Sequence, residues 1–138
     1  MEDLLNKESV KRVLKVLNDF DQSIKVQNLD TTARTAKDAA ESLKTEIGSI
    51  VKSLLLRRQS SFLLCLVAGD KRCSLNKIKK LLNEKDVSMA NADQVKEITG
   101  FTIGGVSPVG HLNKVDIFID DSLAVSYTHL TLPTTEAV

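Results

Sequence analysis

The chain has 138 residues, of which 42% are hydrophobic and 27% charged, a size and balance typical of one globular domain with one core. Its formal net charge of +1 excludes an overall basic field, so a nucleic acid would have to be bound by a local patch. Aromatic residues make up only 4%, with no Trp, which argues against an aromatic surface for stacking bases.

The first half of the chain predicts two helices and then two strands. Apolar residues recur at helical spacing over 10–20, which predicts an amphipathic helix, and a short strand is expected over 24–29. Thr35 can cap a second helix. The apolar runs 49–57 and 61–69 indicate two strands joined closely enough for an antiparallel hairpin, and apolar residues at both parities indicate burial on both faces.

The second half predicts two capped helices and one more strand. Ser74 can cap a helix. Its buried stripe would comprise Leu75, Ile78, Leu81 and Leu82. Asn91 and Gln94 resemble a capping box that opens a further helix, which Gly100 ends, and residues 115–123 alternate like a strand with two unlike faces. We therefore expect one compact α+β domain, with a curved mixed sheet flanked by helices, rather than a doubly wound parallel sheet.

The last segment departs from this pattern. Residues 125–134, VSYTHLTLPT, continue no strand pattern and match what one reading frame of a common transposon-based sequencing adapter encodes. We expect the domain to occupy 1–124 without its natural last segment, and 125–138 to be read-through. The alternative is a genuine, divergent C-terminus. On the first interpretation Tyr127 and His129 carry no functional role.

The cysteines and the hydropathy of the chain indicate the cellular compartment. Cys65 and Cys73 are too few and too unpatterned for a zinc site or a disulfide framework, so we expect reduced thiols. The N-terminus lacks the apolar core of a signal peptide, and no apolar run approaches membrane-spanning length. The sequence predicts a cytoplasmic protein with no membrane partner, no metal and no cofactor.

Lys52 stands in the middle of a predicted strand, flanked by Ile50 and Leu54 on its own face. Lysine is almost never fully buried without a partner, because desolvation disfavours its charged form. Two interpretations stay open. The side chain reaches water or a carboxylate, or it presents its amine to a cleft.

The loop GFTIGGVSPVGH, residues 100–111, is the second unusual feature. Gly104, Gly105 and Gly110 can adopt dihedrals closed to other residues and let a ligand approach the main chain, and Pro108 stiffens the same turn. Such a loop can direct successive N–H groups at an oxygen atom, although it lacks the Walker and dinucleotide-binding motifs. The alternative is a loop that only reverses the chain.

Other candidate residues have less context. His111 is the only histidine outside the tail, and a lone histidine is more often a satisfied or surface residue than a ligand. No serine has the context of a nucleophile. The run GDKRCSLNKIKK, residues 69–80, is the best candidate for a nucleic-acid patch, and its alternative is a solvated helix face.

Five segments, taken in order and spacing, resemble the YbaK/EbsC family of aminoacyl-tRNA editing domains, which are related to the insertion domain of bacterial prolyl-tRNA synthetases. The segments are TARTAKDAAESL, IVKSLLLR, LLCLVAGDKR, SMANADQVKEITGFTIGGVSPVGH and VDIFIDDSL. The resemblance spans residues 9 to 124. It implies a compact α+β fold with a mixed, barrel-like sheet. Family members continue into another strand and a small-residue loop, where the adapter-like tail stands here.

The resemblance also implies a reaction, the hydrolysis of the ester that joins a wrong amino acid to the 3′-terminal ribose of tRNA. Lys52 corresponds to the family's invariant lysine and would hold the tRNA terminus or polar groups of the substrate. The main chain of Gly104 and Gly105 would orient the ester carbonyl, so that water attacks without an enzyme nucleophile.

Further substrate contacts are implied around this site. The implied substrate-binding residues are Thr32, Arg34, Ser107, Pro108 and His111. The leading hypothesis is a trans-editing deacylase for tRNA(Pro) that carries a small wrong amino acid. Its partners would be the tRNA acceptor end and prolyl-tRNA synthetase. The rival hypothesis is a non-catalytic tRNA- or synthetase-binding module of the same fold.

Overall fold

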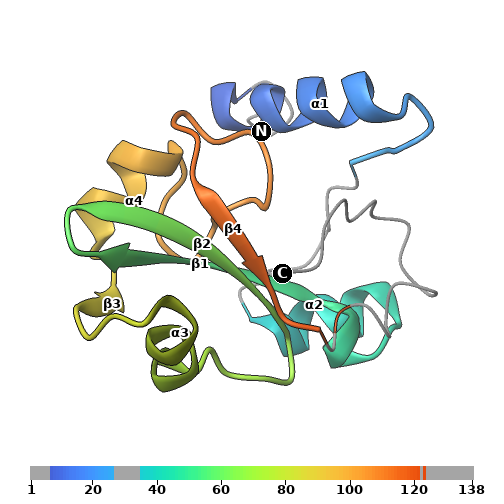
Figure 1. The fold of residues 1–138 in the computed structure, drawn as a ribbon. Helices are drawn as coiled ribbons and strands as arrows, with labels where there is room; N and C mark the ends of the chain where they lie inside the picture. The colour runs from blue at the N-terminus through green and yellow to red at the C-terminus, as the bar shows by residue number, and fades with distance from the viewer. Residues whose placement is uncertain (1–6, 27–34, 122, 124–138) are drawn as a thin grey trace.

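The computed structural model describes residues 7–26, 35–121 and 123 (Figure 1). The elements in chain order are α1 (Glu8–Phe20), α2 (Ala36–Leu43), the 3-10 helix η2 (Ile47–Ser49), β1 (Val51–Arg58), β2 (Ser61–Ala68), α3 (Leu75–Leu82), β3 (Val87–Met89), α4 (Ala92–Thr99) and β4 (Asp116–Ile119). The predicted adapter-derived tail lies outside the described residues.

The sheet is mixed and open. Its strand order is β3-β1-β2-β4, with β1 antiparallel to both β2 and β3, and β2 parallel to β4. The α+β class and the mixed sheet are therefore confirmed, whereas the barrel-like sheet is corrected, because the four described strands do not close. The strand β3 pairs only with Leu56, Arg57 and Arg58. The first half of β1 consequently stays at an edge of the sheet.

Both faces of the β1–β2 hairpin are buried, as predicted. One face contributes Leu55, Leu64 and Leu66 to a cluster that includes Val95 of α4. The other face contributes Leu56, Leu63, Cys65 and Val67 to a cluster that includes Ile78 of α3. Figure 1 shows α3 and α4 on the two sides of the hairpin. Two layers of helices thus fix the sheet between them.

The predicted helix caps are confirmed. Thr35 Oγ1 accepts a hydrogen bond from the Asp38 N–H at 3.1 Å, and Ser74 Oγ accepts one from the Lys77 N–H. Asn91 forms the full capping box with Gln94. A cap of this kind stabilises its helix by about 1 kcal/mol. These short helices therefore begin where the sequence specifies.

One strand was not expected, and two expectations about local structure were wrong. The strand β3 was not predicted, because three residues carry too little alternation to be recognised. Residues 24–26, the described part of the strand expected over 24–29, are not in a strand and follow a local turn in which the Ser23 N–H donates to Asp21 Oδ1. Leu81 is 72% exposed. It lies on the flank of the stripe that α3 buries, because a helix of two turns can bury only a narrow face.

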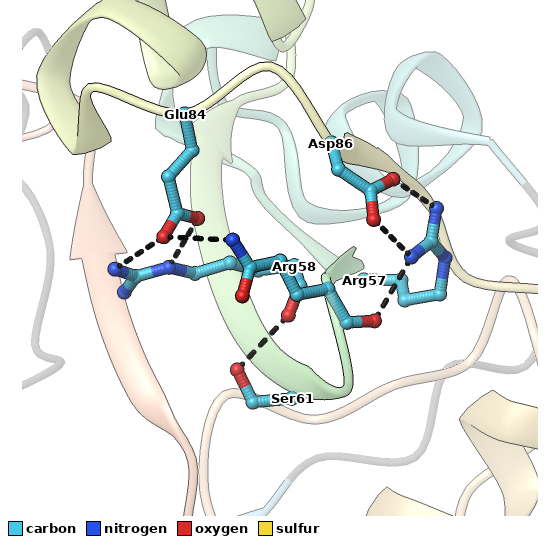
Figure 2. A network of polar contacts seen from close by, with 6 residues as sticks. Arg57, Arg58, Ser61, Glu84 and Asp86 are labelled. Carbon is cyan, nitrogen blue, oxygen red and sulfur yellow. Dashed lines mark hydrogen bonds and ion pairs between the residues drawn. The ribbon is translucent and has the colours of Figure 1, made fainter.

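Two ion pairs fasten the connection between α3 and β3 to the end of β1 (Figure 2). Arg57 Nη2 lies 2.8 Å from Asp86 Oδ1, and Arg58 Nε lies 2.7 Å from Glu84 Oε2. The Arg57 guanidinium lowers the pKa of Asp86 through hydrogen bonding. Both arginines are therefore engaged at the opposite end of β1 from Lys52.

Candidate functional site

A cavity of about 610 Å³ lies along the open first half of β1. Its described lining comes mainly from α2, β1 and the loop after α4, with single residues from η2, β3, α4 and the segments beside them. It comprises Thr35, Ala36, Lys37, Ala39, Ile47, Ile50, Val51, Lys52, Ser53, Leu54, Leu55, Gly69, Met89, Ala90, Val95, Ile103, Gly104 and Val106. This volume falls in the range of small-molecule sites, about 300 to 1,000 Å³. The cavity exists at this position because β3 ends before it can cover the first half of β1.

Lys52 lines this cavity from the half-buried part of β1. Its ammonium group donates a hydrogen bond to the main-chain carbonyl of Lys71, which follows the end of β2. No described carboxylate forms an ion pair with it. Lys52 therefore lies at the edge of the sheet and also borders a cavity. Among the described residues it has no acidic partner.

Gly104, in the loop after α4, also lines the cavity. Its φ of +82° is a left-handed conformation that glycine adopts without strain, and a Cβ atom there would meet nothing within 4 Å. The Gly105 N–H donates to the Thr102 carbonyl at 2.9 Å, which closes the turn. The Gly105 N–H is thus already hydrogen-bonded within the loop. The Gly104 N–H forms no hydrogen bond with another described residue.

The other predicted loop residues are absent from the described lining. The His111 Nε2 atom lies 2.6 Å from the Ser107 carbonyl oxygen, which can only accept, so Nε2 carries the proton. Burial lowers the pKa of His111, and its ring packs edge-on against Phe101 at 6.0 Å. Ser107 Oγ accepts from the Val109 N–H. His111 and Ser107 therefore hold the shape of the loop, together with the stiff Pro108.

Arg12 connects α1 to both ends of this loop. Its Nε donates to the Gly110 carbonyl at 3.0 Å and its Nη2 to the Gly100 carbonyl at 3.2 Å. Its Cζ lies 5.1 Å from the centre of the Phe101 ring, a cation–π distance. Gly110 permits this approach, since a Cβ there would lie 3.2 Å from the Val13 nitrogen. We call Arg12 and these loop contacts the Arg12 clamp.

Ser53 is a second residue that the sequence did not single out. It lines the cavity, and its Oγ is buried without a hydrogen-bond partner among the described residues. A buried hydroxyl without a partner costs free energy that a bound polar group would recover. The predicted contacts Thr32 and Arg34 lie outside the described residues. Their neighbour Thr35 is on the cavity wall.

The described lining contains no carboxylate, imidazole or thiol. Its residues with polar side chains are Thr35, Lys37, Lys52 and Ser53. The described residues also contain no cluster of three or more His, Cys, Asp or Glu side chains suited to a metal ion. This part of the site can therefore position a ligand and stabilise negative charge, but it offers no general base of its own.

The backbone conformation of Gly104 gives a stability prediction. Gly104→Ala should lower the free energy of unfolding by about 1 kcal/mol, because a left-handed conformation is strained for alanine even where space is open. Gly105→Ala is the matched control, since its Cβ would make only an ordinary contact with Thr102. Urea denaturation measures both. Equal losses in the two variants would contradict the conformational explanation.

None of the described helices is long and apolar enough to cross a membrane.

The chain is similar to parts of much longer enzymes. It is 38% identical over 87 residues to the proline–tRNA ligase of Kosmotoga olearia. The alignment covers 63% of this chain and 15% of the ligase. It is 32% identical over 106 residues to the proline–tRNA ligase of Thermosipho melanesiensis. The alignment covers 75% of this chain and 19% of the ligase. The chain thus spans less than a fifth of these curated relatives.

A solved structure has a similar fold over most of the chain. It is the crystal structure of a candidate trans-editing enzyme for prolyl-tRNA synthetase, with a TM-score of 0.78 and 37% identity, and the alignment covers 85% of this chain and 74% of that one. The sequence profile of the aminoacyl-tRNA editing domain matches residues 30–136. This match spans well over half of the sequence, and the chain therefore belongs to the family of aminoacyl-tRNA editing domains.

Proposed function

We propose that this domain is a trans-editing aminoacyl-tRNA deacylase, and that its substrate is tRNA(Pro) esterified with a small wrong amino acid. The observation that carries the proposal is the cavity with Lys52 and Gly104 on its walls, in a domain of the editing family. The similarity to proline–tRNA ligases and to a candidate trans-editing enzyme supports the choice of tRNA. Such an enzyme would act in the cytoplasm with prolyl-tRNA synthetase.

The small residues of the lining leave room for an aminoacyl group in the cavity. Five of the lining residues are alanine or glycine, namely Ala36 and Ala39 of α2, Gly69, Ala90 and Gly104. Gly69 has no room to grow, because a Cβ there would collide with the Ile47 carbonyl oxygen. A synthetase discriminates poorly between side chains of nearly equal volume, so a second, hydrolytic pocket is needed to remove the smaller wrong one.

The mechanism depends on positioning. The Lys52 ammonium would bind a ribose hydroxyl or phosphate oxygen of the tRNA terminus, and the main chain at Gly104 would face the ester carbonyl. Water would add to the carbonyl carbon, assisted by a hydroxyl of the substrate, and the bond to the ribose oxygen would break to release the amino acid and tRNA. Held close to the carbonyl, such a water gains much of its rate from proximity and from donors that stabilise the oxyanion.

Basic residues beside Lys52 would bind the acceptor stem. Lys71 and Arg72 are exposed directly after β2, and Lys77 and Lys80 are exposed on α3. The Lys71 carbonyl accepts a hydrogen bond from the Lys52 ammonium, so the segment that contains Lys71 and Arg72 lies beside Lys52. Contacts of this kind neutralise phosphates without reading sequence, and they weaken as salt increases.

A deacylation screen tests the function. The purified domain is incubated with a panel of mischarged and correctly charged tRNAs, and the release of amino acid is followed. We expect tRNA(Pro) carrying a small wrong amino acid to be hydrolysed and Pro-tRNA(Pro) to be spared. Binding without hydrolysis of any substrate would reject the deacylase and favour the adaptor module.

A further inference from the structure

The structure brings the two cysteines together. Cys65 is buried in the middle of β2, and Cys73 is partly exposed just before Ser74, the cap of α3. Their Sγ atoms lie 3.6 Å apart and are in hydrogen-bond contact. Both are free thiols. A disulfide needs these atoms at about 2.05 Å, so closure requires a movement of only about 1.5 Å.

The two thiols have unequal environments. The hydrogen bond with Cys65 lowers the pKa of Cys73 most strongly, burial opposes this, and the nearby Lys52 ammonium lowers it further. The same hydrogen bond and burial raise the pKa of Cys65. Cys73 is therefore the thiol that ionises first and reaches solvent, whereas Cys65 is a protonated partner within reach of it. Redox-active cysteine pairs have this division between an attacking and a resolving thiol.

We propose that Cys73 and Cys65 form a redox-active pair that closes to a reversible disulfide by exchange with a small-molecule disulfide. The Cys73 thiolate attacks one sulfur of the small disulfide, whose S–S bond breaks, and one small thiol leaves with a proton. Cys65 then loses its proton and attacks the Cys73 sulfur, which releases the second small thiol. Both cysteines are oxidised, and the small disulfide is reduced to two thiols.

Closure should act on Lys52. Cys65 is fixed by the ladder of β2, between β1 and β4, so the segment that contains Cys73 must move. Lys71 lies two residues before Cys73, and its carbonyl accepts the hydrogen bond from the Lys52 ammonium. Oxidation should therefore displace the Lys71 carbonyl and weaken its hydrogen bond with Lys52, the one cationic residue of β1 in the cavity lining. The thiol pair itself does not depend on the proposed function.

Mass spectrometry of the native protein tests the pair. After incubation with oxidised glutathione, we expect the chain to lose two hydrogen atoms and to yield a peptide that crosslinks Cys65 with Cys73, reversed by dithiothreitol. Cys65→Ala should instead retain one glutathione on Cys73, and Cys73→Ser should stay unmodified, with folding checked by circular dichroism. Stable glutathionylation of both thiols in the wild type, or no reaction at all, would overturn the proposal.

Amine labelling tests the link to Lys52 without any activity assay. The rate of Lys52 acetylation by acetic anhydride is measured by peptide mapping in the reduced and the oxidised protein. We expect it to rise on the order of tenfold after oxidation, as one hydrogen bond from a charged donor is lost. Lys96, exposed on α4, is the internal control and should not change. Equal Lys52 rates in the two forms would show that the disulfide does not act on the cavity.

Discussion

Lys52→Ala should lower kcat/KM for deacylation by about 100-fold, since it removes the cation that would hold the tRNA terminus, and an ester displaced by about 1 Å from its reactive position can lose about 10² in rate. The variant should stay folded, because the ammonium group's described hydrogen bond goes to one carbonyl, that of Lys71, and not to a carboxylate. The measurement is single-turnover release of amino acid from mischarged tRNA(Pro), with circular dichroism as the folding check.

Lys77→Ala is the matched control for this loss. Lys77 is an exposed lysine of α3 and is not among the lining residues of the cavity. Its removal should weaken tRNA binding slightly and reduce the salt dependence, without changing the hydrolytic step. Should Lys52→Ala hydrolyse as fast as the wild type, the cation at the cavity wall has no part in the reaction.

The local structure of this chain follows closely from its sequence. Thr35, Ser74 and Asn91 each begin a helix, because a side-chain oxygen at that position satisfies a backbone N–H that the helix leaves free. The hairpin follows from two apolar runs with a short connection. These signals act over a few residues, and they are read correctly because nothing distant in the chain competes with them.

Long-range features were not readable in the same way. Arg12 stands on the polar side of an amphipathic helix, where an arginine is ordinarily solvated, and only the fold brings it to two carbonyls 88 and 98 residues away. Cys65 and Cys73 have no spacing motif. They meet because the chain turns sharply between β2 and α3. The open edge of β1, which creates the cavity, depends on where β3 ends.

The candidate site was anticipated in part. Lys52 and Gly104 were expected on one pocket from the lysine in an apolar strand and from the glycine loop, and both line the cavity. The role expected for the Gly105 N–H did not allow for the turn, in which that group is already bonded to Thr102. Ser53 was passed over, since a serine in a strand has no pattern that distinguishes a cavity-facing hydroxyl from any other.

Arg12→Met should lower the free energy of unfolding by about 2 kcal/mol, because it removes two hydrogen bonds from a charged donor to main-chain carbonyls and keeps the apolar stem. The loop between Gly100 and Gly110 would lose its attachment to α1. Gly104 lies within this loop, so deacylation should also fall, by about tenfold, through misplacement of its main chain. Urea denaturation and hydrogen exchange of the loop amides measure the two effects separately.

Two variants make this prediction specific to the Arg12 clamp. Lys11→Met alters the neighbouring position of α1, whose side chain is exposed and only pairs with Glu8 at 3.8 Å, and it should leave both stability and loop exchange unchanged. Arg12→Lys keeps the charge but not the two-pronged geometry, and it should recover less than half of the loss. If Arg12→Met and Lys11→Met exchange their loop amides at the same rate, the clamp does not position the loop, and Gly104 is held in place by the Phe101, Ser107 and His111 contacts alone.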